Sequence, residues 1–307
     1  MSRLLTHVFE PGFFSSSPVR TAIIVGALAA LVSGAIGVFT VMRGQSFAGE
    51  ALADIGATGG SGAYLVGVGP LWGFLVIGVI AAAAMELIGI QRPRGRDLAT
   101  GVVLGAGLGL AALFLYLDST YQSTTGAAVT ILFGSVFAIS GSTTALVIVL
   151  ALAVLGILLS VHRPLLLSSV SPDMAAARGI PVRAVGFAYL LALSLSISLC
   201  ALTIGAILST ALLVGPAAAA LRITKRPGMA ILTAGLLGMA ATWLGILLAY
   251  DSYYWPPTGR GWPVSFFVVS IVFVIYLLSG LPAWRASRRP SRTGSELVAA
   301  PGSERDG

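Results

Sequence analysis

The stretch GAIGVFTVMRGQSFAGEALADIGATGG (residues 34–60) joins an apolar run to a glycine-rich run that carries two carboxylates, Glu50 and Asp54. The whole chain has 307 residues, of which 57% are hydrophobic and 9% are charged, and its mean hydropathy is +0.96. Soluble domains contain about one quarter charged residues, so this composition predicts an integral membrane protein. A carboxylate inside a bilayer costs about 2.5 kcal/mol or more, so the pair indicates a functional site.

Nine apolar runs approach the roughly 20 residues that a membrane-spanning helix needs. They are residues 19–42, 50–68, 69–90, 98–117, 141–161, 184–201, 203–221, 229–250 and 264–282. A further run, residues 127–140, has the shorter length of a re-entrant or interfacial segment. We therefore expect an all-α polytopic integral membrane protein with about nine transmembrane helices plus one re-entrant or short segment.

The basic residues gather in four places that should face the cytoplasm, because cytoplasmic loops carry an excess of Lys and Arg. They are Arg92, Arg94 and Arg96; His162, Arg163, Arg178 and Arg183; Arg222, Lys225 and Arg226; and Arg285, Arg288, Arg289 and Arg292. The loops 118–126 and 251–263 contain one basic residue, Arg260, and several aromatic residues, so they should face outside. The basic loops and these two loops alternate between the two sides of the membrane only if residues 127–140 do not cross it. This pattern predicts a multi-pass protein of the cell membrane with a cytoplasmic C-terminus.

The same bias accounts for the net charge of +7, and no nucleic-acid partner is expected. We expect a polar or interfacial N-terminal segment (residues 1–18), a transmembrane domain (residues 19–282) and a disordered basic tail (residues 283–307). Counting the predicted crossings back from the basic loop at Arg92 places the N-terminal end outside the cell.

Two sequence features inside the predicted spans concern helix packing. Gly101, Gly105 and Gly109 repeat every four residues, which lets a neighbouring backbone approach closely. Pro216 removes a backbone donor in the middle of a span and should kink or break that helix. Such a kink occurs beside transport pathways, but a simple packing bend explains Pro216 equally well.

Two interpretations of Glu50 and Asp54 follow from the residues alone. In the first, residues 44–54 form an inner loop and the helix begins after it. In the second, the acids stand one turn apart on a helix and offer oxygen ligands to a hard divalent ion, to which Ser46 and Thr58 add weaker oxygens. In that case Gly56, Gly59, Gly60 and Gly62 allow an opened, close-packed segment.

Four stretches resemble the ABC-3 family, the integral membrane permeases of ATP-binding-cassette importers for zinc, manganese and iron. Residues 34–60 look like the end of the family's first helix and its glycine-acid-Ala-Leu-Ser-His segment. SPDMAAARGIPVRAVGF (residues 171–187) looks like its coupling segment, and ILSTALLVGPAAAALRITKRP (residues 207–227) is similar to its proline-containing helix. LFGSVFAIS (residues 132–140) fits the short segment before the coupling region.

The resemblance implies a fold like that of type II ABC importers and assigns roles to individual residues. Glu50 stands at the family's aspartate position and Asp54 at its histidine position, so both are candidate metal ligands. Replacing imidazole by carboxylate shifts the preference from zinc toward manganese or ferrous iron, and we favour manganese. In the coupling segment, about residues 168–183, the candidate contacts to the ATPase are Asp173, Ala177, Arg178 and Gly179.

The resemblance also implies partners, because this chain has no phosphate-binding loop of its own. A separate ATPase subunit would use the ATP, an extracytoplasmic solute-binding protein would deliver the ion, and two permeases would pair as a homodimer among the membrane lipids. No cofactor is expected in this chain, and the metal ion is substrate. The alternatives are a secondary ion-coupled carrier and an ABC permease for a non-metal substrate. An intramembrane hydrolase is disfavoured because no histidine lies in mid-membrane.

Overall fold

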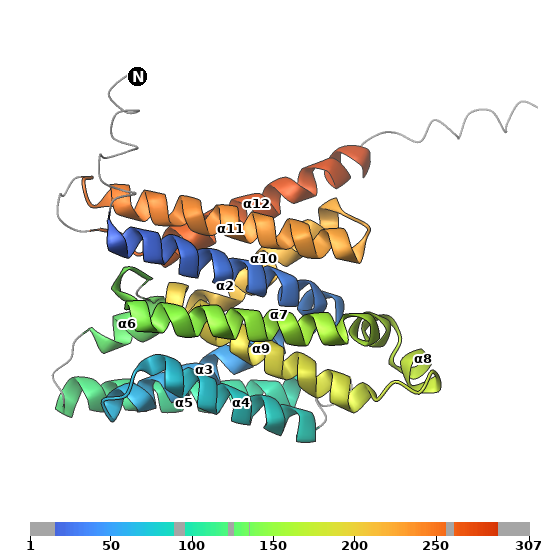
Figure 1. Ribbon diagram of the computed structural model, residues 1–307, viewed down its shortest axis with the longest axis horizontal. Helices are drawn as coiled ribbons and strands as arrows, with labels where there is room; N and C mark the ends of the chain where they lie inside the picture. The colour runs from blue at the N-terminus through green and yellow to red at the C-terminus, as the bar shows by residue number, and fades with distance from the viewer. Residues whose placement is uncertain (1–15, 89–95, 122–125, 135, 256–260, 288–307) are drawn as a thin grey trace, which may run out of the picture.

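The computed structural model describes residues 16–88, 96–121, 126–134, 136–255 and 261–287, which form helices and no strand. Figure 1 shows the long helices side by side in one bundle, with α6 and α8 near opposite ends. The helices are α2 (Ser17–Met42), α3 (Ser46–Leu65), α4 (Pro70–Ile88), α5 (Arg96–Tyr121), α6 (Ala127–Phe133), η1 (Val136–Ala138), α7 (Gly141–Val170), α8 (Pro172–Ala177), α9 (Val182–Ile204), α10 (Ala206–Ile223), α11 (Pro227–Ser252) and α12 (Val264–Ser287).

The long helices confirm the predicted class of fold. Within the described ranges, eight helices are long and apolar enough to cross a membrane. The ninth long helix, α3, has 20 residues but is not among them; it contains two acids and many glycines, which lower its hydropathy. Residues 1–15 and 288–307 lie outside the described residues, and so do Arg92, Arg94 and Arg260.

The short segment between α5 and α7 does not cross the bundle, as predicted. Its helix α6 has seven residues, and both α5 and α7 meet it at the same end of the bundle (Figure 1). Gly134 (φ 78°) and Gly205 (φ 87°) bring this segment against the break between α9 and α10. A Cβ atom on Gly205 would lie 2.1 Å from the carbonyl oxygen of Leu132, so only glycine permits this contact.

Two cavities mark the two ends of the bundle. At one end, which we call the aromatic end, Tyr250, Tyr254 and Trp262 line a cavity with Pro18 at the start of α2. At the other end, which we call the basic end, a cavity is lined by the residues Met42, Arg163, Arg178 and Lys225. Helix α2 therefore begins at the aromatic end, opposite the end that carries Arg163 and Arg178. This placement relative to the basic loops agrees with the number of crossings counted in the sequence.

Helix α12 runs back from the aromatic end toward the basic end. It starts at Val264, which lines the cavity at the aromatic end. Near the basic end, the guanidinium carbon of Arg222 lies 3.9 Å from the ring centroid of Tyr276 on α12, a cation–π contact. The final turns of α12 thus lie at the same end of the bundle as α8 (Figure 1).

Close packing through glycine holds the helices together. Helix α2 is central, with 15 of its 26 residues buried, and a Cβ atom on Gly37 would lie 2.0 Å from the carbonyl oxygen of Leu213 on α10. Helices α3 and α4 cross at Gly59 and Gly73, where a Cβ atom on Gly59 would lie 2.3 Å from the Gly73 oxygen. Small residues stabilise membrane bundles because they let backbones approach within dispersion range.

The structure changes the interpretation of the packing features. Nothing described in the chain lies within 4 Å of a Cβ atom placed on Gly101, Gly105 or Gly109, so these glycines do not pack inside the chain. Gly107, on another face of α5, packs against α3 instead. A Cβ atom on Gly107 would lie 3.2 Å from the backbone nitrogen of Ile55. Helix α10 also continues through Pro216, so the chain is not broken there; a kink at Pro216 remains a prediction.

The crossing of α3 and α4 gives a test of this packing. We expect Gly59→Ala to destabilise the fold by about 1–3 kcal/mol, because the added methyl group meets backbone rather than a flexible side chain. The measurement is the thermal unfolding midpoint of the purified protein in detergent. Gly156→Ala on α7, where the methyl group meets nothing within 4 Å, is the matched control. Equal midpoints for the two variants would contradict the packing argument.

Candidate functional site

A tight turn at the basic end decides where α3 begins. After α2, the Gly44 N–H donates to the Val41 carbonyl (3.1 Å) and the Gln45 N–H donates to the Thr40 carbonyl (2.9 Å). With Gly44 at φ 61°, this is the hydrogen-bond pattern of a glycine helix cap. It lets α3 start immediately, at Ser46. The interpretation of residues 44–54 as a loop is therefore wrong.

Glu50 and Asp54 consequently lie on the helix, one turn apart on one face. At 1.5 Å per residue they stand about 6 Å and about 12 Å along α3 from Ser46, in the half of the helix nearer the basic end. The Asp54 side chain is buried, with 4% of its surface exposed, and Glu50 is partly exposed. Within the described part of the chain, neither carboxylate forms a hydrogen bond or an ion pair.

The glycines beyond Asp54 do not open the helix, which corrects one expectation. Helix α3 is continuous to Leu65. Cβ atoms on Gly56 and Gly60 would lie 2.9 Å and 2.4 Å from the ring of Phe74, so the glycines serve close packing against α4. The expectation that these glycines allow close packing is confirmed. An intact helix satisfies its own peptide groups, which an opened segment in a bilayer would leave unpaired.

Thr58 ties the acid-bearing helix to α5. Its hydroxyl oxygen lies 2.7 Å from the Gly107 carbonyl oxygen and 3.2 Å from the Asp54 carbonyl oxygen, so its proton is best donated to Gly107. The missing side chain of Gly107 permits this approach. The hydroxyl oxygen keeps its lone pairs and lies one turn beyond Asp54, on the same helix face. The orientation of the acids is thereby coupled to the packing of α5.

An anchor beside the site was not anticipated from the sequence. The Tyr189 hydroxyl donates to Thr40 Oγ1 (2.9 Å), and the guanidinium carbon of Arg43 lies 5.0 Å from the centroid of the same tyrosine ring. Glu86 on α4 also interacts electrostatically with Arg43. The sequence alone does not indicate which face of α9 carries Tyr189. The cluster joins α2, α4 and α9 just before the turn into α3.

The pair of acids suits a cation chemically. Two carboxylates one turn apart repel each other unless a cation or a proton lies between them. Hard divalent cations prefer oxygen ligands, usually six or more for manganese-like and calcium-like ions. The described residues contain no group of three or more His, Cys, Asp or Glu side chains placed to hold a metal. One copy of this chain therefore offers two carboxylates, which is an incomplete ligand set.

The predicted coupling segment forms a short capped helix. The Met174 N–H donates to Ser171 Oγ (3.4 Å) at the start of α8. At its end the Ile180 N–H donates to the Ala175 carbonyl (3.1 Å), and Gly179 has φ 76°. Ser171 therefore caps the start of α8, and Gly179 follows its end in a left-handed conformation. The four candidate contacts are exposed on this segment: Asp173, Ala177, Arg178 and Gly179.

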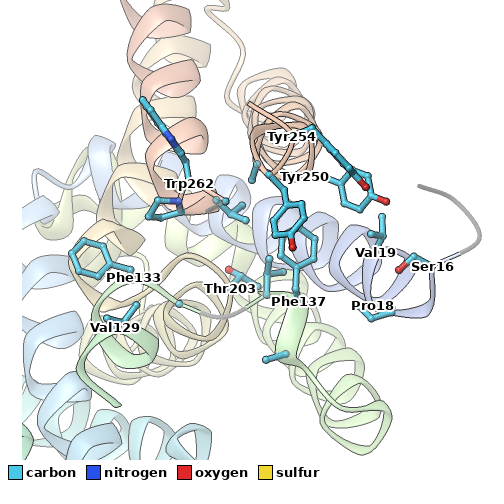
Figure 2. A pocket seen from close by; sticks show the side chains of 18 residues that line it. Ser16, Pro18, Val19, Val129, Phe133, Phe137, Thr203, Tyr250, Tyr254 and Trp262 are labelled. Atoms are coloured by element: carbon cyan, nitrogen blue, oxygen red, sulfur yellow. The ribbon is translucent and has the colours of Figure 1, made fainter. Parts of the chain in front are cut away.

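The cavity at the aromatic end has a different character. Figure 2 shows Phe133, Phe137, Tyr250 and Trp262 among the side chains that surround it, and its volume is about 570 Å³. Its lining includes no acidic or basic side chain among the described residues, and neither Glu50 nor Asp54 contributes to it. This cavity offers no ligand for a metal ion, so the acids on α3 remain the candidate metal site.

Comparison with known proteins identifies the family. A sequence model of the ABC 3 transport family matches residues 16–280. The chain belongs to the ABC 3 transport family. The match covers every described helix from α2 to most of α12, including both α3 and α8. The resemblance seen in the sequence is thereby confirmed.

Relatives within this family are similar over most of their length. The chain is 31% identical over 250 residues to the manganese transport system membrane protein MntC of Halalkalibacterium halodurans, covering 80% of this chain and 84% of that protein. It is 30% identical over 243 residues to the protein of the same name from Listeria monocytogenes, covering 79% and 85%. A solved structure, PsaBC from Streptococcus pneumoniae in complex with Fab, matches with a TM-score of 0.75 and 25% identity over 88% of this chain and 93% of that chain.

The hydrogen bond between α3 and α5 can be tested directly. We expect Thr58→Val to lower the free energy of unfolding by about 0.6 kcal/mol, the average for interhelical hydrogen bonds in membranes. Thr58→Ser keeps the hydroxyl group and is the matched control. The measurement is reversible unfolding in mixed micelles. A serine variant as unstable as the valine variant would show that the hydroxyl group contributes nothing.

The end of α8 supplies a second test. A Cβ atom at φ 76° costs about 1 kcal/mol, so Gly179→Ala should weaken the helix cap. We expect the Ile180 amide to exchange its hydrogen about fivefold faster, measured by hydrogen–deuterium exchange in detergent. Gly228→Ala at the start of α11, in open space, should leave exchange at Ile180 unchanged. Unchanged exchange in Gly179→Ala would rule out the cap.

Proposed function

We propose that the chain is the permease subunit of an ATP-binding-cassette importer for a divalent transition metal ion, with manganese favoured. The observation that carries the proposal is the pair Glu50 and Asp54 on one face of α3, with Asp54 buried and without a counter-ion among the described residues. Burying an unneutralised carboxylate is costly, so the site favours a cation. Membership of the ABC 3 transport family and relatives named for manganese transport support this function.

The type of ligand supports the choice of metal. Carboxylate oxygens suit manganese and ferrous iron, whereas zinc sites usually contain imidazole or thiolate. Among the described residues the histidine is His162, whose ring lies 6.0 Å from that of Phe39, and it belongs to no group of three or more His, Cys, Asp or Glu side chains placed to hold a metal. A manganese ion passing Glu50 and Asp54 would exchange part of its water shell for carboxylate oxygens.

A second copy of the chain would complete the ligand set. One copy supplies two carboxylates, and a homodimer with a central path would bring four to the same ion. Four carboxylates and a few waters satisfy the six-fold coordination of a hard cation. Without a cation, the four carboxylates of such a site would repel one another strongly. This repulsion favours rapid binding of a metal ion.

The basic end fits the cytoplasmic side and the ATPase. Helix α8 and the arginines near it lie there, as the excess of positive charge in cytoplasmic loops requires. We place the C-terminus on the same side, because α12 runs toward that end. A separate ATPase subunit docks on Asp173, Ala177, Arg178 and Gly179, and an extracytoplasmic solute-binding protein delivers the ion to the aromatic end.

Metal uptake by cells tests this function. The chain is expressed with its ATPase and solute-binding protein, and accumulation of manganese, zinc and ferrous iron is measured. We expect manganese to accumulate, and we expect Glu50→Gln and Asp54→Asn each to reduce uptake about tenfold or more, because each removes a charged ligand. The variants Glu50→Asp and Asp54→Glu keep the charge and should retain more uptake than their neutral counterparts.

Three outcomes would overturn the proposal. Full uptake in both neutral variants at matched expression would remove the acids from the path. Uptake that continues when the ATPase subunit is inactivated would indicate a secondary ion-coupled carrier. If no metal accumulates in the wild type, the cargo is a non-metal substrate.

A further inference from the structure

The cavity at the basic end is the larger of the two end cavities, with a volume of about 940 Å³. It lies where α2, α7 and α10 end and where the chain turns into α9 and α11. Most of its lining is apolar, including Leu167 and Leu221. Three cations, Arg163, Arg178 and Lys225, complete the lining. The predicted transport role uses Arg178 and leaves the rest of this cavity unexplained.

The three cations have no described counter-ion. No hydrogen bond or ion pair joins any of these side chains to another residue that the structure describes, and all three are exposed. The lining contains no acidic side chain; Asp173 lies on α8 outside it. Three positive charges around one apolar cavity are complementary to an anionic group with an apolar body.

The depth of the cavity matches the headgroup layer of a bilayer. Arg163 lies 22 residues after Gly141, or about 33 Å along α7, while the hydrocarbon core is about 30 Å thick. Pro164 follows within the helix, and Figure 1 shows the carboxyl end of α7 turned away from the line of its longer part. Arginine at this depth therefore reaches phosphate groups while the apolar lining faces acyl chains.

Exposed apolar side chains next to the cavity support the same ligand. Val170, Ile223 and Met229, at the ends of α7, α10 and the start of α11, are 75%, 56% and 51% exposed. Apolar surface at a membrane interface is stabilised by lipid chains, whereas a free phosphate ion would use only the cations. Basic pockets between transmembrane helices on the cytoplasmic side bind acidic headgroups.

We infer that this cavity binds an anionic phospholipid of the inner leaflet, with the phosphate between Arg163, Arg178 and Lys225 and the first part of the acyl chains against the apolar wall. The inference rests on the proposed membrane orientation and is independent of the cargo. Because Arg178 belongs to the segment that is predicted to contact the ATPase, the lipid would lie beside that contact and hold it in place.

Native mass spectrometry of the full chain in detergent tests this site. The protein is titrated with phosphatidylglycerol or with phosphatidylcholine of the same acyl chains, without metal or ATPase. We expect tighter binding of phosphatidylglycerol, and about fivefold weaker binding in each of Arg163→Gln and Lys225→Gln, because each cation contributes about a factor of five. Arg226→Gln, which neutralises the exposed neighbour of Lys225 outside the lining, is the control and should change binding less than twofold.

Several outcomes would overturn the inference. Equal binding of the two lipids, or equal weakening by Arg226→Gln, would show that general surface charge is responsible. Competition by inorganic phosphate at the same concentration as the lipid would indicate a free phosphate site. Loss of ATPase copurification in Lys225→Gln with unchanged lipid binding would assign the cavity to the protein partner. Elution profiles on size exclusion check folding, and Lys225→Gln, in an exposed turn, keeps the test valid if Arg163→Gln misfolds.

Discussion

Peptide groups inside a bilayer find no water, so each crossing must keep its backbone hydrogen bonds within its own helix. This constraint explains why α3 remains helical through a run of glycines that would be irregular in a soluble protein. The glycines are useful for another reason, because they let α4 and α5 approach the α3 backbone at Gly59 and Gly107. Close contact on two sides then holds a helix whose composition is too polar to be stable in lipid alone.

The position of the acids follows from the same packing. Asp54 is buried because α5 covers that part of α3, and Thr58 fixes the two helices relative to each other. A flexible loop carrying the same carboxylates would let them separate and relieve their repulsion. Held one turn apart on a rigid helix, they cannot do so, and a cation becomes the most effective way to neutralise them. In the proposed metal site, the rigidity of the scaffold would therefore increase the affinity for a cation.

Much of the architecture was predictable from sequence, since apolar runs of about 20 residues between basic and aromatic loops specify crossings and their direction. The ends of α8 were also predictable, because serine and glycine, here Ser171 and Gly179, cap and end helices through interactions with residues nearby in the chain. The start of α3 was not predictable from the sequence. An inner loop after Gly44 and a helix that begins at Ser46 have the same composition and differ only in their hydrogen bonds. The partner of each glycine was equally hidden: Gly107 packs and Gly105 does not, and their surroundings in the sequence are alike.

The non-crossing segment formed by α6 and η1 has a consequence for the whole molecule. With it excluded, an odd number of long helices runs from the start of α2 to the end of α12, so the two ends of the described chain lie at opposite ends of the bundle. If the ATPase docks at α8, as proposed, a nucleotide-hydrolysing domain joined covalently to this protein would reach that surface from the end of α12 and not from the start of α2. A domain joined to the amino end would meet the opposite compartment, where the aromatic cavity opens.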